Sequence, residues 1–212
     1  GKTLQNSDRV TCKGRSLYPK SFEQMLAVVY DQNQSEPWLP YTSQYHILQI
    51  KSAYEFLIYM RFASPFMLVS DRDAVLDLRF NPQPDGDVQV VFKVHSHAPV
   101  AQQEGVVRME IFEGEWWVQR QDKKNTVVTY ELRAEAGGWV PQWMVDYVSR
   151  TLPVRVLKGL RAQMNRKDDF LTTPNFLGQI FKVPRLSSSS EPIPVEKNIE
   201  QNNRTPRSAE TR

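Results

Sequence analysis

The residues best suited to proton transfer or metal binding are the three histidines of the chain, His46, His95 and His97. His95 and His97 are two residues apart, so a strand would place both side chains on one face. An acid–base or metal-binding role for this pair would also need a convergent carboxylate. No such carboxylate is evident nearby in the sequence, so we expect the histidines to lie in solvated loops.

Charged residues offer a second kind of chemistry, the recognition of a polar head group. In the run Asp71-Arg72-Asp73, an arginine fork between two carboxylates would tie a loop to a sheet. We expect this anchoring role, with a ligand contact as the alternative. Arg108 lies on a predicted strand whose other face is apolar, and a shift of one residue in register decides whether it points inward. Arg108 and Glu110 form the one titratable pair that an enzyme could use.

Motifs of known catalytic sites do not occur in the sequence. We find no Gly-rich phosphate loop, no nucleophile elbow and no His-Glu-x-x-His motif. A single cysteine, Cys12, excludes an internal disulfide and a Cys-clustered metal site, and we expect it to be a small strand residue. The sequence therefore predicts a protein that is not an enzyme and that needs no cofactor or metal.

Composition and charge narrow the class of protein further. The 212 residues include 27 Lys and Arg against 24 Asp and Glu, and much of the basic excess follows residue 160. This argues against a nucleic-acid surface. No run approaches the roughly 20 apolar residues of a membrane span, and no signal peptide opens the chain. We expect a soluble protein, cytoplasmic or periplasmic if bacterial, although the start at Gly1-Lys2 leaves the compartment open.

Hydrophobic periodicity predicts one early helix followed by a series of strands. The helix covers 21–30 with Ser21 as its N-cap, and a loop with two prolines follows over 31–40. Turn residues then divide the chain into short strands. With no long helix between them these strands predict one antiparallel sheet, over 45–50, 54–62, 74–80, 88–94, 106–112, 115–120 and 126–134, with a hairpin turn at 113–114.

A long helix is predicted from about Val140, after the break at Gly137-Gly138. Residues at helical spacing form one continuous apolar face in its first half: Val140, Trp143, Met144, Tyr147 and Val148. Pro153 should kink the helix, and a second apolar stripe follows on a rotated face. We expect Trp139, Val140 and Trp143 to pack in the core, with a bilayer interface as the alternative. The glycine pair is a candidate hinge for this helix.

The fold class predicted is α+β, a cup of antiparallel strands closed by the long helix. Bulky apolar residues alternate on the inward face of the strands: Phe56, Ile58, Met60, Val88, Val90, Phe92, Trp116, Val118, Val128, Tyr130 and Leu132. These side chains either fill a solid core or line a cavity, and both alternatives stay open. We predict a domain over 1–165, a partly ordered extension over 166–186 and a disordered tail over 187–212.

Four segments resemble the steroidogenic-acute-regulatory-related lipid-transfer (START) domains, and more closely their bacterial relatives. They are 65–75, which reads P-x-x-x-V-S-D-R-D-x-V; 105–110 with Trp116-Trp117; 126–130 with 137–145; and 153–161. The resemblance covers roughly residues 10–164. It implies the helix-grip fold and a tunnel for one lipid or sterol-like molecule, in a carrier or sensor that makes transient contact with a membrane surface.

On this basis we predict a set of ligand-binding residues: Phe56, Ile58, Met60, Val90, Phe92, Arg108, Trp116, Val128, Tyr130, Trp143, Met144 and Tyr147. The chain departs from the family in two respects. Only 20 residues precede the helix at 21–30, so the N-terminal edge of the sheet looks shortened. Tyr59 and Leu78 stand where cholesterol-carrying members have a buried Glu and Arg, which argues against cholesterol as the ligand.

Two further functions are alternatives to the lipid carrier. The first is an enzyme on a helix-grip scaffold, such as a cyclase or hydrolase of aromatic polyketides, which would require a titratable pair facing the cavity. The second is an interaction module with a filled core, which would bind a protein partner through residues 170–212. These residues include several large apolar side chains that could dock on the domain or on the partner.

Overall fold

The computed structural model describes residues 9–31 and 38–166. The loop expected at 31–40 is therefore described only at its ends, and the predicted extension and tail beyond residue 166 lie outside the described residues. In chain order the elements are β1 (Arg9–Tyr18), α1 (Phe22–Tyr30), β2 (Thr42–Ile50), β3 (Glu55–Phe62), β4 (Asp71–Pro82), β5 (Val88–Val94), β6 (Val106–Arg108), β7 (Ile111–Arg120), β8 (Thr126–Glu135) and α2 (Gln142–Arg166).

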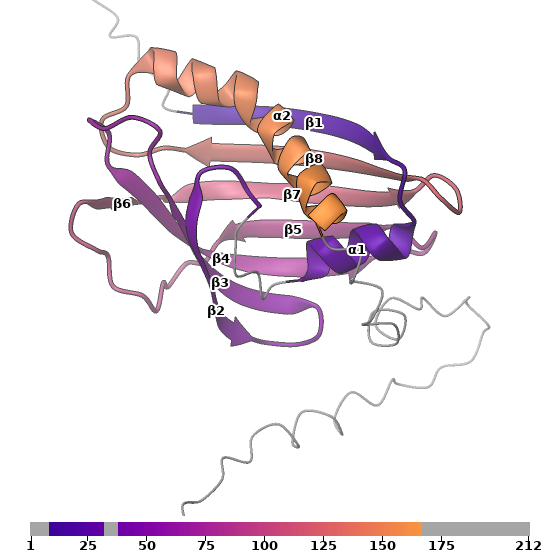
Figure 1. Ribbon diagram of the computed structural model, residues 1–212. Helices are drawn as coiled ribbons and strands as arrows, with labels where there is room; N and C mark the ends of the chain where they lie inside the picture. Colours follow the sequence, from indigo (N-terminus) through magenta and orange to yellow (C-terminus); the bar gives the residue numbers. More distant parts are fainter. Residues whose placement is uncertain (1–8, 32–37, 167–212) are drawn as a thin grey trace, which may run out of the picture.

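The strands form one curved sheet in the order β1-β8-β7-β5-β4-β3-β2, with neighbours antiparallel along this path. The short strand β6 lies off the path and pairs with β4 in parallel. Figure 1 shows α2 lying across one face of the sheet, with α1 beside its C-terminal end. The α+β class and the cup closed by a C-terminal helix are confirmed. Neither described helix is long and apolar enough to cross a membrane.

β1 was not among the strands predicted from the sequence, although Cys12 was expected to lie in a strand. Its residues alternate between exposed and buried, with Val10, Cys12 and Tyr18 among the buried ones. β1 pairs with β8 over its whole length, from Arg9 opposite Glu135 to Tyr18 opposite Thr126. Cys12 lies in this strand as expected, and burial raises the pKa of its thiol to about 11. The edge of the sheet is thus a full strand that also packs against α2.

The predicted hairpin at 113–114 was wrong. β7 runs without interruption through Gly114, which lies opposite Leu132 of β8. A Cβ atom at Gly114 would lie 2.2 Å from the carbonyl oxygen of Glu131 and 2.6 Å from the ring of Phe92. Glycine is therefore required there by the close approach of neighbouring atoms and does not mark a turn.

Local signals placed both helices well. α1 begins after Ser21, whose side chain accepts a hydrogen bond from the backbone of Gln24 in a complete capping box. α2 begins at Gln142, two residues later than predicted, and contains Pro153. Figure 1 shows the axis of α2 bending partway along its length, as expected of an interior proline.

A candidate ligand-binding cavity

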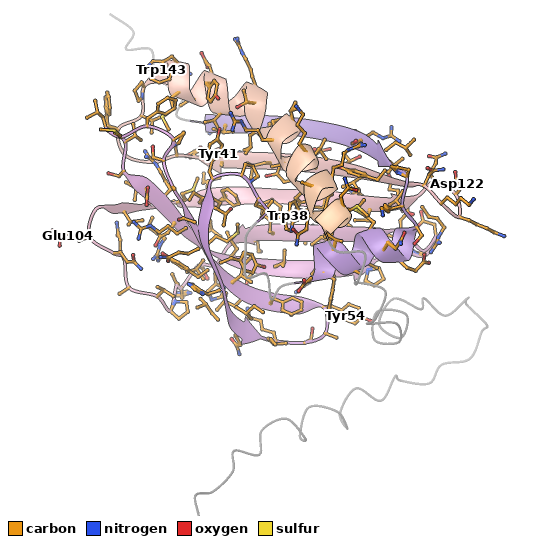
Figure 2. All side chains as sticks on the ribbon, viewed as in Figure 1. Trp38, Tyr41, Tyr54, Glu104, Asp122 and Trp143 are labelled. Carbon is orange, nitrogen blue, oxygen red and sulfur yellow. The ribbon has the colours of Figure 1, made fainter. Side chains whose placement is uncertain are left out.

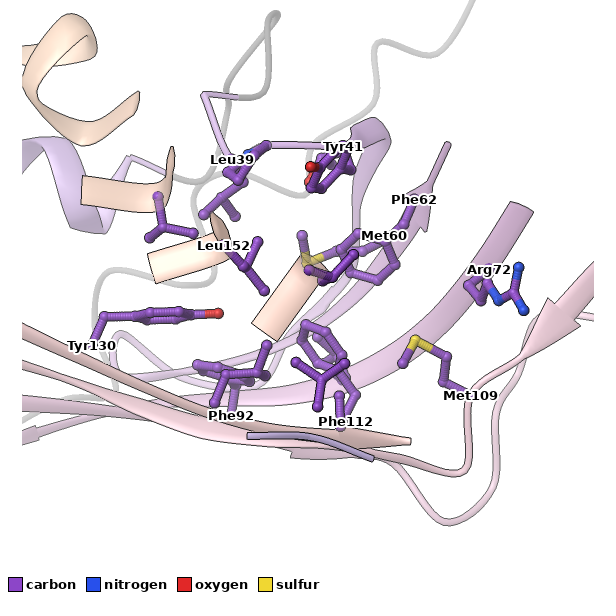
Figure 3. Close-up of a pocket in the computed structure, with 18 of the residues that line it drawn as sticks. Leu39, Tyr41, Met60, Phe62, Arg72, Phe92, Met109, Phe112, Tyr130 and Leu152 are labelled. Carbon is purple, nitrogen blue, oxygen red and sulfur yellow. The ribbon is translucent and has the colours of Figure 1, made fainter. Parts of the chain in front are cut away.

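The sheet and α2 enclose a cavity of about 220 Å³. A single buried water needs only roughly 10–15 Å³ of such space, so the interior of the cup is hollow and the solid core considered above was wrong. Strands β3, β4, β5, β7 and β8 form the floor, and α2 forms the roof. Residues 38–42 and 63–65 line the side between β2, β3 and the helix (Figure 3).

Of the twelve predicted ligand-binding residues, seven line this cavity: Ile58, Met60, Val90, Phe92, Trp116, Tyr130 and Met144. Phe56 and Val128 are buried in the core but do not line the cavity. Arg108, Trp143 and Tyr147 lie outside it, because the register turns Arg108 to the outer face of the sheet and α2 turns both aromatic side chains outward. Contact of the seven lining residues with a ligand remains a prediction.

Other lining residues escaped the sequence analysis. They come from the segment before β2 and the start of β2, from β4, from the link between β6 and β7, from β7 and from the middle of α2, and include Trp38, Leu39, Tyr41, Thr42, Leu76, Met109, Phe112, Leu152 and Val156. Phe112 was placed at the end of a separate strand, so its alternation with Trp116 was not visible. The residues at 38–42 follow Pro37 and include Pro40, and they carry no periodic pattern that could have revealed them.

Aromatic rings pack closely along the cavity floor. The ring centroids of Trp116 and Tyr130 are 4.5 Å apart, and those of Trp38 and Trp116 are 5.6 Å apart. Phe92 lies 5.6 Å from Phe112. Such contacts pack the rings against one another, and the surface that they present to the cavity is apolar.

The run Asp71-Arg72-Asp73 does not form the expected fork of one arginine between two carboxylates. Asp71 instead accepts hydrogen bonds from Arg61 and from the backbone N–H of Ser64. Asp73, fully buried, forms a bidentate ion pair with Arg108, with distances of 2.6 Å and 3.0 Å. The anchoring role holds, but each residue of the run has a different partner. Arg108 thus fastens β6 to β4 on the outer face.

Arg72 closes one end of the cavity. Its guanidinium donates to the backbone carbonyl oxygens of Ser70, Ala136 and Gly137, with distances of 3.2 Å to Ala136 and 3.1 Å to Gly137. Figure 3 shows this group pointing away from the centre of the cavity, so its aliphatic part forms the wall. Arg72 therefore ties β4 to the turn that precedes α2.

The candidate hinge has a backbone that only glycine adopts readily. Gly137 and Gly138 both have φ of 62°, and a Cβ atom at either position would lie 3.2–3.3 Å from the side chain of Val107. Alanine at these positions would strain the turn directly, so the double alanine change is a poor test of hinge motion. The hinge itself remains a prediction.

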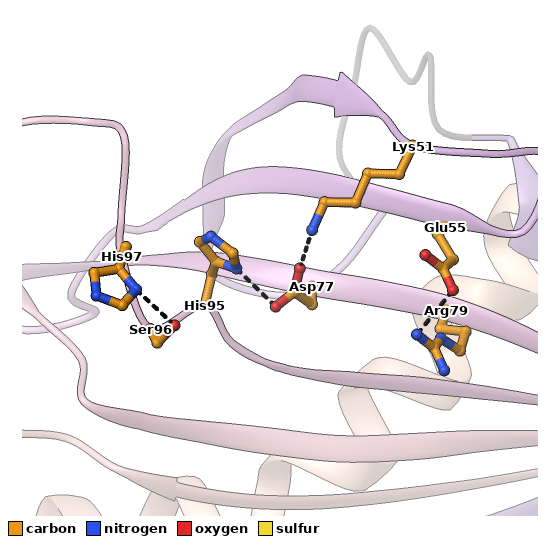
Figure 4. Close-up of polar contacts among 7 residues, drawn as sticks. All are labelled: Lys51, Glu55, Asp77, Arg79, His95, Ser96 and His97. Carbon is orange, nitrogen blue, oxygen red and sulfur yellow. Dashed lines mark hydrogen bonds and ion pairs between the residues drawn. The ribbon is translucent and has the colours of Figure 1, made fainter.

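The histidines lie on the outer side of the sheet. The Nδ1 atom of His95 is 2.8 Å from the carboxylate of Asp77, which also accepts a hydrogen bond of 2.7 Å from Lys51 (Figure 4). The expectation that no carboxylate lies near His95 was therefore wrong. His97 contacts only Ser96 in this cluster. No group of three potential metal ligands occurs among the described residues.

Apart from Arg72, whose guanidinium is bound to backbone carbonyls, the described polar side chains that line the cavity are neutral. Among the described residues that line it, none is Asp, Glu or His. Tyr130 is buried, and desolvation raises the pKa of its hydroxyl well above the usual value. Figure 3 shows this hydroxyl directed toward the middle of the cavity. Such a site can enclose an apolar molecule and contact its polar atoms, and its described lining includes no carboxylate or imidazole.

Large apolar side chains are exposed beside the cavity. Trp139 and Trp143 are 71% and 57% exposed, so their expected place in the core was wrong, whereas Val140 does line the cavity. Figure 2 shows Trp143 on the outer side of the first turns of α2. Its ring centroid lies 4.8 Å from that of Phe66, in the loop where Met67 and Leu68 are 102% and 90% exposed. The helix start and this loop thus form one apolar surface, defined here as the rim.

A curved antiparallel sheet closed by a C-terminal helix around an apolar cavity defines the helix-grip class of ligand-binding proteins. Within this class, the model of the START domain matches residues 16–169, well over half of the chain. The chain therefore belongs to the START domain family. This finding confirms the resemblance seen in the four sequence segments.

One curated protein is similar to part of the chain. An uncharacterized protein of Pseudomonas aeruginosa is 29% identical over 99 residues, which are 47% of this chain. The chain spans about half the length of this curated relative, with 48% covered.

Solved structures show the shared fold. A STAR-related lipid transfer protein from Xanthomonas axonopodis is similar with a TM-score of 0.66 and 23% identity, over 77% of this chain and 90% of that one. Human STARD10 has a TM-score of 0.68 and 15% identity, over 84% of this chain and 73% of that one. The Zhui aromatase/cyclase from a Streptomyces species has a TM-score of 0.54 and 13% identity, over 75% and 95%. At these identities the likeness concerns the fold alone.

Proposed function

We propose that this protein binds one lipid or other apolar small molecule in its cavity and acts as a carrier or sensor for it. The observation that carries the proposal is the hollow, aromatic-lined interior between the sheet and α2. Transfer of apolar surface out of water contributes roughly 25 cal/mol per Å², so a molecule that fits this interior binds without needing an ion pair. Membership of the START family supports the same function.

Catalysis is the less favoured alternative. Similarity to an aromatase/cyclase makes an enzyme on this fold worth considering. A cyclase or hydrolase would need an acid–base pair beside the substrate. The candidate pair named above does not meet this requirement, because Arg108 is bound to Asp73 on the outer face and Glu110 is exposed. We therefore propose that the ligand leaves the cavity chemically unchanged.

Transient contact with a membrane is the second part of the proposal, and the rim supports it. Met67 and Leu68 expose apolar surface on the loop whose residues Ser64 and Pro65 line the cavity. Tryptophan side chains, of which Trp143 is one here, are favoured at bilayer interfaces because they join an apolar body to a polar N–H. A membrane at the rim would lie directly beside the cavity, and a ligand could pass between the two without crossing water.

Native mass spectrometry of the protein purified from its host tests the binding proposal. We expect an adduct of lipid mass in a one-to-one ratio, and extraction followed by identification would name the ligand class. A clean apo mass that stays unchanged after incubation with mixed lipid vesicles would contradict the proposal. That result would favour the alternative function, binding of a protein partner through residues 170–212, a part of the chain that the structure does not describe.

The membrane contact can be tested separately by sedimentation with phosphatidylcholine vesicles. The double change Met67→Ser and Leu68→Ser should weaken vesicle binding by at least about thirtyfold, because each side chain contributes on the order of 1–2 kcal/mol when it leaves water. Ile50→Ser is the matched control, since Ile50 is 64% exposed at the end of β2 far from Thr42, where the cavity is lined. Equal loss in control and double variant would argue against a rim-specific contact.

A further inference from the structure

Two hydroxyl groups in the cavity wall have no hydrogen-bond partner among the described residues. They are the Tyr41 hydroxyl and the Oγ1 atom of Thr42, and both atoms are buried. Both residues line the cavity. Nearly all buried polar atoms in folded proteins are paired, because leaving one unpaired is unfavourable. Two adjacent exceptions among the described residues, both on the cavity wall, favour a hydrogen-bond partner that lies in the cavity.

The backbone is distorted at the point that brings both hydroxyls to the wall. Successive residues of a regular strand point to opposite faces, so two neighbours do not normally line the same cavity. Tyr41 has φ of 66°, and it is the one non-glycine residue with positive φ in the described part of the chain. The pairing of β2 with β3 also shifts register between Thr42 and Gln44. A bulky residue in this conformation is strained, and such strain is typically retained at ligand sites.

The position of Tyr41 is further fixed from the side of α2. The guanidinium carbon of Arg155 lies 5.5 Å from the centre of the Tyr41 ring, and Arg155 also donates a hydrogen bond of 2.9 Å to the hydroxyl of Tyr147. The Tyr41 ring is thus held under the helix by a cation–π contact. This contact uses the face of the ring and leaves the hydroxyl available.

The other polar groups near the ligand space are neutral or turned away. The Tyr130 hydroxyl points into the cavity from the opposite side, apart from Tyr41 in Figure 3. Arg72 gives its N–H groups to backbone carbonyls at the cavity end. An ionised head group would therefore meet hydroxyls but no free countercharge, and burying an unpaired ion is strongly unfavourable.

We propose that Tyr41 and Thr42 form a polar subsite that binds a neutral oxygen-bearing group of the ligand, a hydroxyl or a carbonyl. The inference rests on the proposed function and refines it, because it states which head groups the cavity selects. Tyrosine and threonine hydroxyls both donate and accept hydrogen bonds, so they suit either group. The ligand class that follows is an apolar molecule with an alcohol, ketone or ester function, in preference to an ionised lipid.

Chain-matched probes test this selection. The probes are dodecane, 1-dodecanol, 2-dodecanone and, at pH 8, laurate. Binding to the full chain is followed by tryptophan fluorescence, since Trp38 and Trp116 line the cavity. We expect 1-dodecanol or 2-dodecanone to bind about tenfold more tightly than dodecane, the gain of roughly one net hydrogen bond. The tighter of the two identifies the hydroxyl or the carbonyl as the preferred group. Laurate that binds as tightly as either would overturn the proposal.

The variant Tyr41→Phe with Thr42→Val removes both hydroxyls and keeps the shape of the wall. In this variant the affinity ratio of 1-dodecanol to dodecane should fall from about ten to about one. Tyr59→Phe is the matched control: its hydroxyl is also buried, but it lies on the outer face with Leu57 and Val75. An unchanged ratio in the double variant, or an equal fall in Tyr59→Phe, would refute the subsite.

Failure of this inference is distinguishable from failure of the proposed function. If the wild-type protein binds none of the four probes, the cavity does not take apolar ligands and both proposals fall. If dodecane and 1-dodecanol bind equally well, the cavity is a ligand site but Tyr41 and Thr42 do not select its polar group. Circular dichroism of the variants shows whether each retains the fold.

Discussion

Filling the cavity with a protein side chain should stabilise the protein and weaken the binding of the proposed ligand. Ala134 of β8 is 3% exposed and lines the cavity. The change Ala134→Leu adds three carbon atoms, each contributing up to about 0.8 kcal/mol when it moves from water into an apolar space. Side-chain ordering opposes this by roughly 0.5–1 kcal/mol, so we expect a net gain of about 1.5 kcal/mol. For a chain of this size the melting temperature should rise by about 3–6 °C.

The matched control is Ala74→Leu in β4. Ala74 is fully buried in the same hydrophobic core but does not line the cavity. Insertion of the larger side chain into close-packed surroundings should destabilise by about 1–3 kcal/mol. Differential scanning calorimetry should show a higher melting temperature for Ala134→Leu and a lower one for Ala74→Leu than for wild type. Fluorescence titration with 1-dodecanol should show roughly tenfold weaker binding to Ala134→Leu than to wild type. If Ala134→Leu is as destabilising as Ala74→Leu, the interior is filled and the reasoning from the cavity is refuted.

Two further predictions concern stability. Gly114→Ala should lower the free energy of unfolding by at least about 2 kcal/mol, because the new Cβ would lie 2.2 Å from the Glu131 carbonyl oxygen. Gly86→Ala is the control, since Gly86 has open space around it and φ of 91°, and this change should lower the free energy of unfolding by only about 1 kcal/mol. Equal urea midpoints for the two variants would contradict this prediction. The backbone N–H of Ser64, helped by Arg61, holds the pKa of Asp71 below its usual value. The stabilisation from this carboxylate is present above the unfolded pKa of about 3.9 and is lost as the pH falls through the folded pKa. Between pH 7 and pH 3, Asp71→Asn should therefore lose less unfolding free energy in urea titrations than wild type, and an equal loss would exclude this linkage.

Much of the fold was predictable because local chemistry and periodicity agreed. Ser21 and Gln24 form the capping box that begins α1, and the bounds of β5 match the predicted 88–94. β1 was missed because its inward positions include Gly14 and Ser16, which give little hydrophobic signal. Gly14 is small because α2 lies against it, with Pro153 Cβ 3.0 Å from where a Cβ would stand. That requirement comes from a helix more than 100 residues away in the sequence.

The candidate site was predictable only where strands alternate regularly. Alternation placed Ile58, Val90 and Tyr130 on the cavity wall. It failed at Arg108, because the short parallel strand β6 turns this side chain to Asp73 on the outer face. It also failed at Trp143, since the apolar face read from helical spacing is wider than the part of α2 that the sheet covers. The position of Tyr41 in the cavity wall could not be predicted, because it depends on a left-handed backbone conformation for which the sequence gives no signal.

The pairing of β1 with β8 also bears on how the chain is made. Arg9 and Glu135, joined by a hydrogen bond of 2.8 Å, are 126 residues apart. At roughly 5–20 residues per second, a ribosome synthesises β8 about 6–25 seconds after β1. During that time β1 lacks its partner strand β8, which also forms part of the cavity floor. The charged side chains of Arg9, Lys13 and Arg15 disfavour pairing with other chains in the interval, as charges on an edge strand do. Closure of the cup by α2, which packs on β1, is therefore a late step in the synthesis and folding of the chain.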